Sequence, residues 1–282
     1  MIAVTVIVNN DVEPCSWRNA DGSVSYQIVP GLKPEHGLAM IFDVSQPDGS
    51  TFRLLADTGQ HASTLKHNLL AAGVDVGSID AVLISHGHYD HAGGLGFLAS
   101  AGFSGHVFVS PLAFRKRYSV SLSLRPDGSS NLMRKENGFP RPELLQSMDV
   151  RYVDCPTDVA HGVTLFPLPS DAPANMRLVD ADGRPDTFPD ELFCLIRSVG
   201  RVVVNGGCTH HGPLQLLSFV RDVLCVDHVD AFVGGLHLVG RPTDEILRVR
   251  DSVRQFGVGA WLVNHCTGAE ALSLFSDLNK QV

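Results

Sequence analysis

The chain has 282 residues, of which 44% are hydrophobic, so it is long enough to bury the core of a single α/β or layered domain. Its formal net charge is -8 and its basic residues are scattered, which argues against nucleic acid or an anionic membrane as a partner. No segment approaches the roughly 18 apolar residues that span a bilayer, and the start lacks a cationic leader, so we expect a cytoplasmic protein. The cysteines stand far apart without a CxxC pair, which argues against a disulfide framework.

The first half of the chain predicts short apolar strands that end in polar turns, and one helix with a glycine stop. The segment between the first two strands is rich in Gly, Pro and Asn. We interpret about 115–150, which carries few apolar runs, as a loop-rich insertion within a single domain that covers 1–282. The predicted strands of this half are 2–8, 39–43, 53–59, 81–85 and 106–111, and the predicted helix is 61–73.

The second half is more regular, because a strand, a histidine and a helix follow one another three times. In open α/β sheets the carboxyl ends of the strands share one ligand site. We therefore expect the histidines at these strand ends to lie close together. The predicted strands are 149–154, 162–168, 191–199, 201–212, 229–240 and 260–268, and the predicted helices are 214–224, 243–256 and a final one after 268.

Residues 86–91 read HGHYDH, directly behind the predicted strand at 81–85 and ahead of Gly93 and Gly94. A lone histidine behind a buried strand is usually structural, but four ligand-type side chains at this spacing would be costly without a cation. Alternate side chains of an extended turn point the same way, so two adjacent metal positions follow. Imidazole and carboxylate groups are ligands of zinc, and iron and manganese also accept them. We expect two divalent metal ions, with zinc as the first choice.

The motif SHGHYDHAGGL resembles the signature of the metallo-β-lactamase-fold superfamily. Further segments are similar to the dihydropterin synthase-like branch, which is named for an enzyme of methanopterin biosynthesis. The resemblance implies an α/β (α+β) fold, an αββα four-layer sandwich, with two metals at one edge of the paired sheets. The segments are EHGLAM at 35–40, LLADTGQ at 54–60, GCTHHG at 207–212, GGLHL at 234–238 and NHCTG at 264–268.

Carried over residue by residue, the resemblance implies a ligand set for both metals. His86 and His88 would bind the first ion, and Asp90 and His91 the second. His265, behind the last strand, would complete the second site. Asp90 would also act in catalysis by orienting the attacking hydroxide.

The third ligand of the first site departs from the usual pattern of the superfamily. The customary mid-chain histidine has no counterpart in 162–173. His210 is the remaining candidate, and the bridging ligand stays open. Cys208 could serve as a thiolate ligand or contact substrate, although we favour His210 as ligand and a buried structural role for Cys208.

The resemblance also points to residues around the metals. Asp57 would accept the free ring N–H of a ligand histidine, or cap a turn. His237, at a strand end, would be catalytic by donating a proton to a leaving group or binding an oxyanion. A local hydrogen bond at a helix start is the alternative for it.

Substrate contacts are expected from an early loop and from a short basic cluster. Glu35 and His36 lie on a loop that the resemblance places near the site. Arg115 and Arg117 could bind a phosphate or carboxylate at the rim, although exposed cations are more often simply solvated.

A close pair of cations activates water and stabilises an anionic leaving oxygen. We therefore predict a binuclear metal-dependent hydrolase that uses a metal-bound hydroxide on a small, anionic ester, lactone or phosphoester. The GxSxG, P-loop and dinucleotide fingerprints are absent. The alternatives are a group-transferring dihydropterin synthase-like enzyme, a di-iron redox enzyme and a non-catalytic sensor. The loops at 10–37, 115–150 and 169–190 would set specificity, and the composition permits a homodimer.

Overall fold

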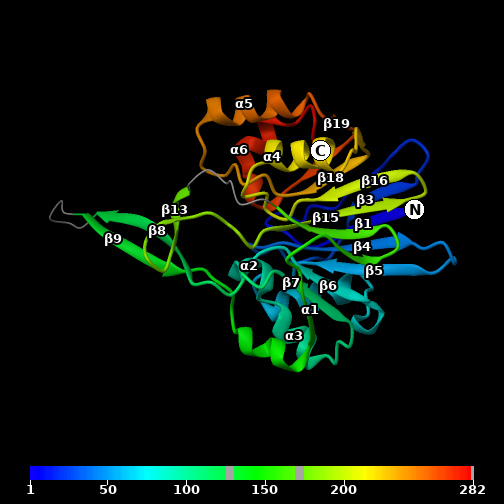
Figure 1. Ribbon diagram of the computed structural model, residues 1–282, viewed down its shortest axis with the longest axis horizontal. Coiled ribbons are helices and arrows are strands. Elements are labelled where there is room, and N and C mark those ends of the chain that lie inside the picture. The colour runs from blue at the N-terminus through cyan, green and yellow to red at the C-terminus, as the bar shows by residue number, and fades with distance from the viewer. Residues whose placement is uncertain (125–129, 169–174, 281–282) are drawn as a thin grey trace.

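Two β-sheets pack face to face, and helices cover the outer face of each (Figure 1). The structure is a computed structural model that describes residues 1–124, 130–168 and 175–280. Helices α1 and α3 lie on one side of the sandwich, and α4, α5 and α6 on the other. The αββα layering expected for this chain is therefore confirmed. The helices are α1 (Ala62–Ala71), α2 (Tyr89–Ala92), α3 (Leu95–Ser100), α4 (Pro213–Ser218), α5 (Thr243–Val253) and α6 (Ala269–Leu274).

The larger sheet has the strand order β10-β7-β6-β5-β4-β1-β3-β2. Its strands β5, β6, β7 and β10 run parallel to one another, as expected when helices connect them. The strands are β1 (Ile2–Val8), β2 (Cys15–Arg18), β3 (Val24–Ile28), β4 (Ala39–Ser45), β5 (Thr51–Ala56), β6 (Ala81–Ile84), β7 (His106–Val109) and β10 (Asp149–Tyr152).

The second sheet has the order β11-β12-β15-β16-β18-β20, and its last three strands are parallel. These three are the predicted strands that end in histidines. A π-helical turn, Phe219–Val223, continues α4. The strands are β11 (Thr157–Ala160), β12 (Val163–Pro167), β15 (Leu192–Ser198), β16 (Arg201–Asn205), β18 (Ala231–Gly234) and β20 (Trp261–Val263).

Strand β4 shows how one short sequence serves two cores. Its alternate residues Met40, Phe42 and Val44 lie in the core between the two sheets. Ile41, which points to the other face, packs in the core beneath α1 and α3. Side chains alternate with period two along a strand, so a continuous apolar run is needed where both faces are covered. That is why the central strands were predictable from their apolar runs.

Three segments that we predicted to be irregular contain strands: the one between the first two predicted strands, 115–150 and the described part of 169–190. The segment between the first two predicted strands holds β2 and β3, and 115–150 holds the antiparallel pair β8 and β9. RYSVSLSL in β8 alternates polar and apolar residues, and this alternation is typical of a strand. The polar segments on both sides make it hard to recognise in the sequence. Part of the segment 169–190 lies outside the described residues. The small sheet β14-β13-β8-β9 comprises β8 (Arg117–Leu124), β9 (Ser130–Glu136), β13 (Asn175–Asp180) and β14 (Pro185–Asp186), and β17 (His228–Val229) pairs with β19 (Gly257–Val258).

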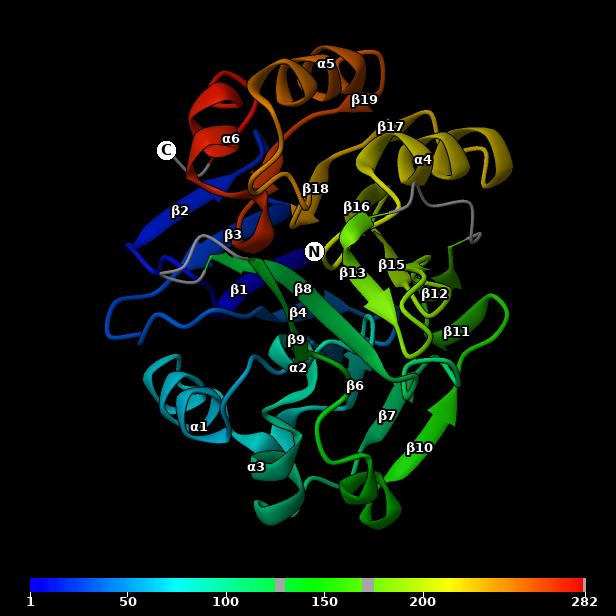
Figure 2. The same cartoon turned by 90° about the vertical axis from the view of Figure 1, so that its left-hand side faces the viewer.

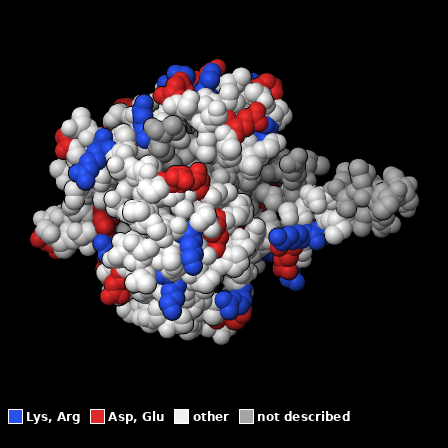
Figure 3. Space-filling model, turned by 180° about the vertical axis from the view of Figure 1, so that it is seen from behind, with Lys and Arg blue, Asp and Glu red and all other residues white. Residues whose placement is uncertain are grey.

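Charged side chains of both signs are interspersed over the rear face of the molecule (Figure 3). The described residues visible in that view form no continuous basic surface. Among the residues that the structure describes, no helix combines the length and the apolar character needed to cross a lipid bilayer.

Candidate metal centre

Three imidazoles meet at the first candidate metal position. His86 Nε2 lies 3.0 Å from His88 Nδ1 and 3.1 Å from His210 Nε2. Burial is the main cause that lowers the pKa of each of these rings, so all three are neutral. A proton on His86 Nε2 could form a hydrogen bond with only one of the two neighbouring nitrogens. A single cation could instead bind the lone pairs of all three rings. Ligand atoms of tetrahedral zinc lie about 3.3 Å apart, so the donor set fits a cation.

The second candidate position lies around Asp90. Its Oδ2 is 3.4 Å from His265 Nε2 and 4.0 Å from His91 Nε2. The His265 nitrogen is buried and has no hydrogen-bond partner, which leaves its lone pair available. Burial opposes ionisation of Asp90, but the neighbouring histidines outweigh it and hold the pKa of this carboxyl well below its usual range. The group therefore offers one carboxylate and two imidazoles, which fits a second cation.

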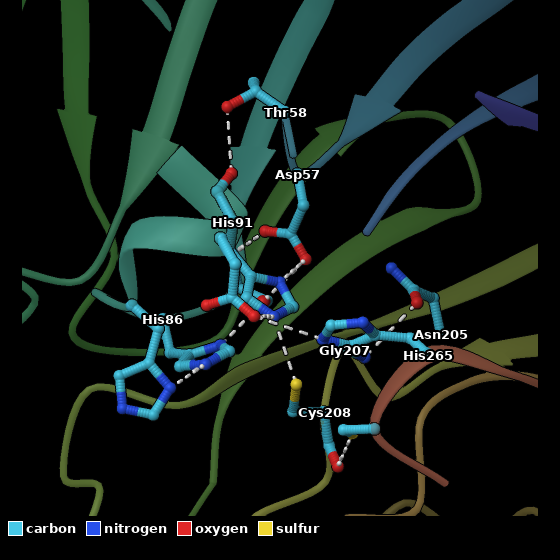
Figure 4. Close-up of polar contacts among 12 residues, drawn as sticks. Asp57, Thr58, His86, His91, Asn205, Gly207, Cys208 and His265 are labelled. Carbon is cyan, nitrogen blue, oxygen red and sulfur yellow. Dashed lines mark hydrogen bonds and ion pairs between the residues drawn. The ribbon is translucent and has the colours of Figure 1, made fainter. Parts of the chain in front are cut away.

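Cys208 lies between the two positions. Its Sγ is 3.1 Å from His91 Nε2 (Figure 4), and it is grouped within ligand distance with His86 and His91, and also with His265 and Cys266. Burial raises the pKa of this thiol well above its ordinary value, so the metal-free protein holds it protonated. A bound cation reverses this preference, since a coordinating thiol is deprotonated.

Asp57 fixes the orientation of the ligand rings from behind. Its Oδ2 accepts hydrogen bonds from His91 Nδ1 at 2.7 Å and from Ser85 Oγ at 2.8 Å, as Figure 4 shows for His91. Ser85 Oγ also lies 3.0 Å from His86 Nδ1. Burial lowers the pKa of His91, but Asp57 and Asp90 raise it to about 9. The metal-free protein therefore holds this ring protonated on both nitrogens. A metal ion would displace the proton from Nε2, while Asp57 keeps the other proton on Nδ1.

The turns that carry the site have left-handed backbone at non-glycine residues. The φ angles are 62° at Asp57, 56° at Thr209, 47° at His237 and 51° at His265. Such conformations cost about 1–3 kcal/mol each and cluster at functional sites. The surrounding hydrogen bonds, such as that from Thr209 Oγ1 to the Gly235 carbonyl at 2.7 Å, hold the strained turns in place.

A buried ion pair that the sequence did not reveal supports the first position. Asp190 Oδ2 accepts the Gly87 N–H at 2.7 Å, between the two ligands of the HxH motif, and its Oδ1 accepts from Arg117 Nη2 at 2.7 Å. Arg117 is 1% exposed and its Nε lies 3.2 Å from Asp186 Oδ2. Arg117 therefore holds the metal-binding loop in place and is not at the rim, where we had placed it.

Glu191 holds the turn that carries His210. Its Oε1 accepts from the His210 N–H at 2.6 Å and its Oε2 from the His211 N–H at 3.1 Å. Burial raises the pKa of Glu191 to about 8, against the effect of these two amides. Phe188 stacks on the His210 ring with centroids 3.8 Å apart. In the sequence, these residues stand out only by position, because Phe188 lies just ahead of the predicted strand at 191–199 and Glu191 begins it.

The remaining predicted site residues separate into two groups. His36 and His237 line the cavity beside the metal positions, and His36 Nε2 lies 3.2 Å from Asp90 Oδ2. The Glu35 carboxylate instead accepts the N–H groups of Gln60 and His61 ahead of α1, at 2.8 and 3.0 Å. Arg115 is exposed and is not among the residues that line the cavity. Neither Glu35 nor Arg115 is placed to contact a substrate there.

The cavity has a volume of about 230 Å³ and opens beside both metal positions. Residues from the small sheet line it on the side opposite the metal-binding turns, so the segment predicted as a loop-rich insertion forms part of its wall. The lining residues are His36, His88, Tyr89, Asp90, Ser119, Lys135, Asn137, Leu178, Cys208, His210, His237, Val239, His265 and Cys266.

Substituting Gly87 by alanine is expected to weaken metal binding and to destabilise the fold by about 1–3 kcal/mol. A Cβ at this position would lie 1.8 Å from the Ala113 carbonyl oxygen, so the loop between His86 and His88 must move. Metal content by elemental analysis and urea unfolding measure both effects. Gly77→Ala is the control, because a Cβ there meets only the Asp75 side chain at ordinary distance. Equal metal content in the two variants would contradict the expectation.

Gly93 and Gly94 allow two segments of backbone to come into close contact. A Cβ on Gly93 would lie 1.8 Å from the Gln60 carbonyl oxygen, and one on Gly94 would lie 2.2 Å from that of Thr58. These glycines therefore let the metal-binding segment pack against the turn that carries Asp57.

Comparisons with known proteins agree with this fold. A curated relative from Methanocaldococcus jannaschii, 7,8-dihydropterin-6-methyl-4-(beta-D-ribofuranosyl)-aminobenzene-5'-phosphate synthase, is 24% identical over 260 residues, which cover 88% of this chain and 86% of the relative. An uncharacterized protein of the same organism is 24% identical over 255 residues, 88% of this chain and 90% of its own. The crystal structure of a metal-dependent hydrolase of the beta-lactamase superfamily superposes with a TM-score of 0.74 at 24% identity, covering 98% of this chain and 93% of that one. The model of the metallo-beta-lactamase superfamily matches residues 46–212, more than half of the chain, and the protein belongs to that superfamily.

Proposed function

We propose that this protein is a binuclear metal-dependent hydrolase of a small, anionic ester, lactone or phosphoester. The observation that carries the proposal is the convergence of buried imidazoles and the Asp90 carboxylate on two adjacent positions beside one cavity. His86, His88 and His210 would hold the first ion. The second set has Asp90, His91 and His265, with Cys208 within reach of both. Zinc suits these ligands, and iron and manganese also accept them.

Two divalent cations in such a donor set lower the pKa of water and stabilise a negatively charged leaving oxygen. The chain's own groups provide the orientation. Asp90 stays ionised and is held between His36 and His265, so it can accept a hydrogen bond from an attacking water. Asp57 holds the Nδ1 proton of His91 in a hydrogen bond, so that Nε2 is the nitrogen that a metal would bind.

His237 is the proposed proton carrier for the leaving group. It lines the cavity with Cys208 and His210, and its ring centroid lies 4.1 Å from that of His210. Its Nδ1 is buried without a hydrogen-bond partner. A partly buried imidazole beside the reacting bond can hold a proton and release it to an oxyanion.

Group transfer is the second candidate function, because one curated relative is named a synthase. The same cations and the same residues would serve it, with an organic acceptor in the place of water. The hydrolase and the transferase differ in whether turnover needs that acceptor.

The test is to incubate the metal-loaded protein with aryl esters, lactones, phosphomonoesters and phosphodiesters without any acceptor. We expect turnover of at least one class, which would exclude an obligate transferase. Absence of turnover for every class, with full metal content by elemental analysis, would contradict the hydrolase. Iron content and oxygen uptake on the same sample test the redox alternative.

Changing Cys208 to serine is expected to remove a thiolate from the metal centre. In cobalt-substituted protein, a sulfur ligand gives intense near-ultraviolet charge-transfer absorption, which an oxygen ligand lacks. We expect this band in the unmodified protein and in Cys194→Ser, because Cys194 is buried in the core between the sheets. We expect its loss in Cys208→Ser. A band of equal intensity in both variants would show that Cys208 is not a ligand.

A further inference from the structure

The small sheet forms the wall of the cavity that faces the metal positions. In Figure 2, β8 and β9 lie in front of α2, at the edge where the sandwich ends. Ser119 of β8, Lys135 of β9 and Asn137 just behind β9 line the cavity on this side. None of the three belongs to a candidate metal position. The Ser119 hydroxyl donates to the Lys135 carbonyl at 3.3 Å, which leaves Lys135 and Asn137 to consider.

Asn137 presents an unused acceptor. The residue is 8% exposed, and its Oδ1 is buried with no hydrogen-bond partner. Its backbone is fixed on both sides, because its N–H donates to the Arg117 carbonyl at 3.1 Å and its carbonyl accepts from the Tyr89 N–H at 3.3 Å. Buried polar groups are nearly always paired. A fixed carboxamide oxygen without a partner beside a cavity is suited to an N–H or O–H of a ligand.

Lys135 adds a positive charge to the same wall. Among the described residues that line the cavity, it is the only lysine or arginine. Its Nζ lies 5.5 Å from the centroid of the Tyr89 ring, and no carboxylate of the described residues forms an ion pair with it. The neighbouring Arg134 is engaged elsewhere, since its guanidinium lies over the Tyr118 ring at 4.4 Å and donates to the Asp180 carbonyl at 3.1 Å. Lys135 is thus the available cation of this wall.

We propose that Lys135 and Asn137 determine specificity: Lys135 binds an anionic group of the substrate remote from the reacting bond, and Asn137 Oδ1 accepts an N–H or O–H beside it. The proposal rests on the proposed function, because it takes the metal positions as the place of reaction. A cavity of about 230 Å³ is smaller than the roughly 300–1,000 Å³ of pockets for drug-sized ligands. It therefore takes the reacting end and one recognition group of the substrate.

Simple carboxylates test the role of Lys135 without requiring turnover. Butyrate has one carboxylate, which the metal centre can hold. Succinate has a carbon chain of the same length and a second carboxylate at its other end. Measured by calorimetry on metal-loaded protein, succinate should bind roughly tenfold more tightly than butyrate, as a charged hydrogen bond allows. Lys135→Gln should abolish this preference, whereas Arg134→Gln should keep it. Equal affinities in the unmodified protein, or a preference that persists in Lys135→Gln, would overturn the role of Lys135.

A second pair of ligands tests Asn137. With 4-hydroxybutyrate, the hydroxyl can donate to Oδ1, so this ligand should bind about fivefold more tightly than butyrate. Asn137→Leu removes the acceptor and should equalise the two, while Asn137→Asp retains an acceptor and should keep the preference. Thermal unfolding of each variant verifies that it is folded. The role of Asn137 would be overturned if the unmodified protein bound 4-hydroxybutyrate no more tightly than butyrate. An unchanged preference in folded Asn137→Leu would overturn it as well.

These outcomes are separate from the fate of the proposed function. If no ester or phosphoester is hydrolysed but the succinate preference depends on Lys135, the result supports the role of Lys135 in recognition and contradicts the proposed hydrolase. If esters are hydrolysed and succinate binds no better than butyrate, the result supports the proposed hydrolase and contradicts the role of Lys135 in recognition.

Discussion

Replacing both His86 and Asp90 by alanine is expected to reduce bound divalent metal to well under one ion per chain and turnover by more than about 100-fold. The two residues contribute to different metal positions, and His86 Nε2 is the atom that both His88 and His210 face. Elemental analysis after dialysis and a steady-state assay of the same preparation measure the two effects together.

The matched control changes a histidine and an aspartate that lie elsewhere. His106 and Asp149 form an exposed ion pair with 2.9 Å between Nδ1 and Oδ2, and it lies outside both metal positions. Alanine at both should leave metal content and turnover near those of the unmodified protein. If His86→Ala/Asp90→Ala behaves like this control, the binuclear centre is wrong.

Changing Arg117 to leucine is expected to lower the free energy of unfolding by about 3–5 kcal/mol, because it leaves buried carboxylates without their counter-charge. Asp186 and Asp190, 5% and 0% exposed, would both lose the guanidinium. Since Asp190 also accepts the Gly87 N–H, we expect metal affinity to fall by roughly 10- to 100-fold as well. Urea unfolding of metal-free protein gives the first effect, and a chelator competition gives the second.

An exposed ion pair provides the comparison for this variant. Arg184 pairs with Asp182 at 3.2 Å on the surface, so Arg184→Leu should change the free energy of unfolding by less than about 1 kcal/mol. Similar losses for the two variants would mean that the buried network contributes little. Unchanged metal affinity in Arg117→Leu would show that the network does not position the HxH loop.

The sequence predicted the central strands well, because they are buried on both faces and read as continuous apolar runs. Strands β2 and β8 were missed for a physical reason. In β2 (CSWR), partly buried and exposed positions alternate over only four residues. In β8, polar segments border the alternating residues RYSVSLSL. A four-residue alternation flanked by Gly and Asn is hard to tell from a loop.

The clustering of the histidines was more predictable than the structure around it. The strand-end rule correctly anticipated that His210, His237 and His265 lie near the HGHYDH segment, because parallel strands end at one edge. The supporting residues carry no such local signal: Arg117 and Asp190 are 73 residues apart, and neither lies in a recognisable motif. Asn137 shows the same limit, since its significance depends on an unpaired atom and not on its neighbours in sequence.

The left-handed turns at His237 and His265 bear on how this protein would respond to selection for heat resistance. Glycine adopts such backbone without steric strain, so a screen that rewards melting temperature alone would favour glycine there. Each such change would loosen a donor or the support behind it. Thermostable variants obtained in that way are the ones to check first for lost metal.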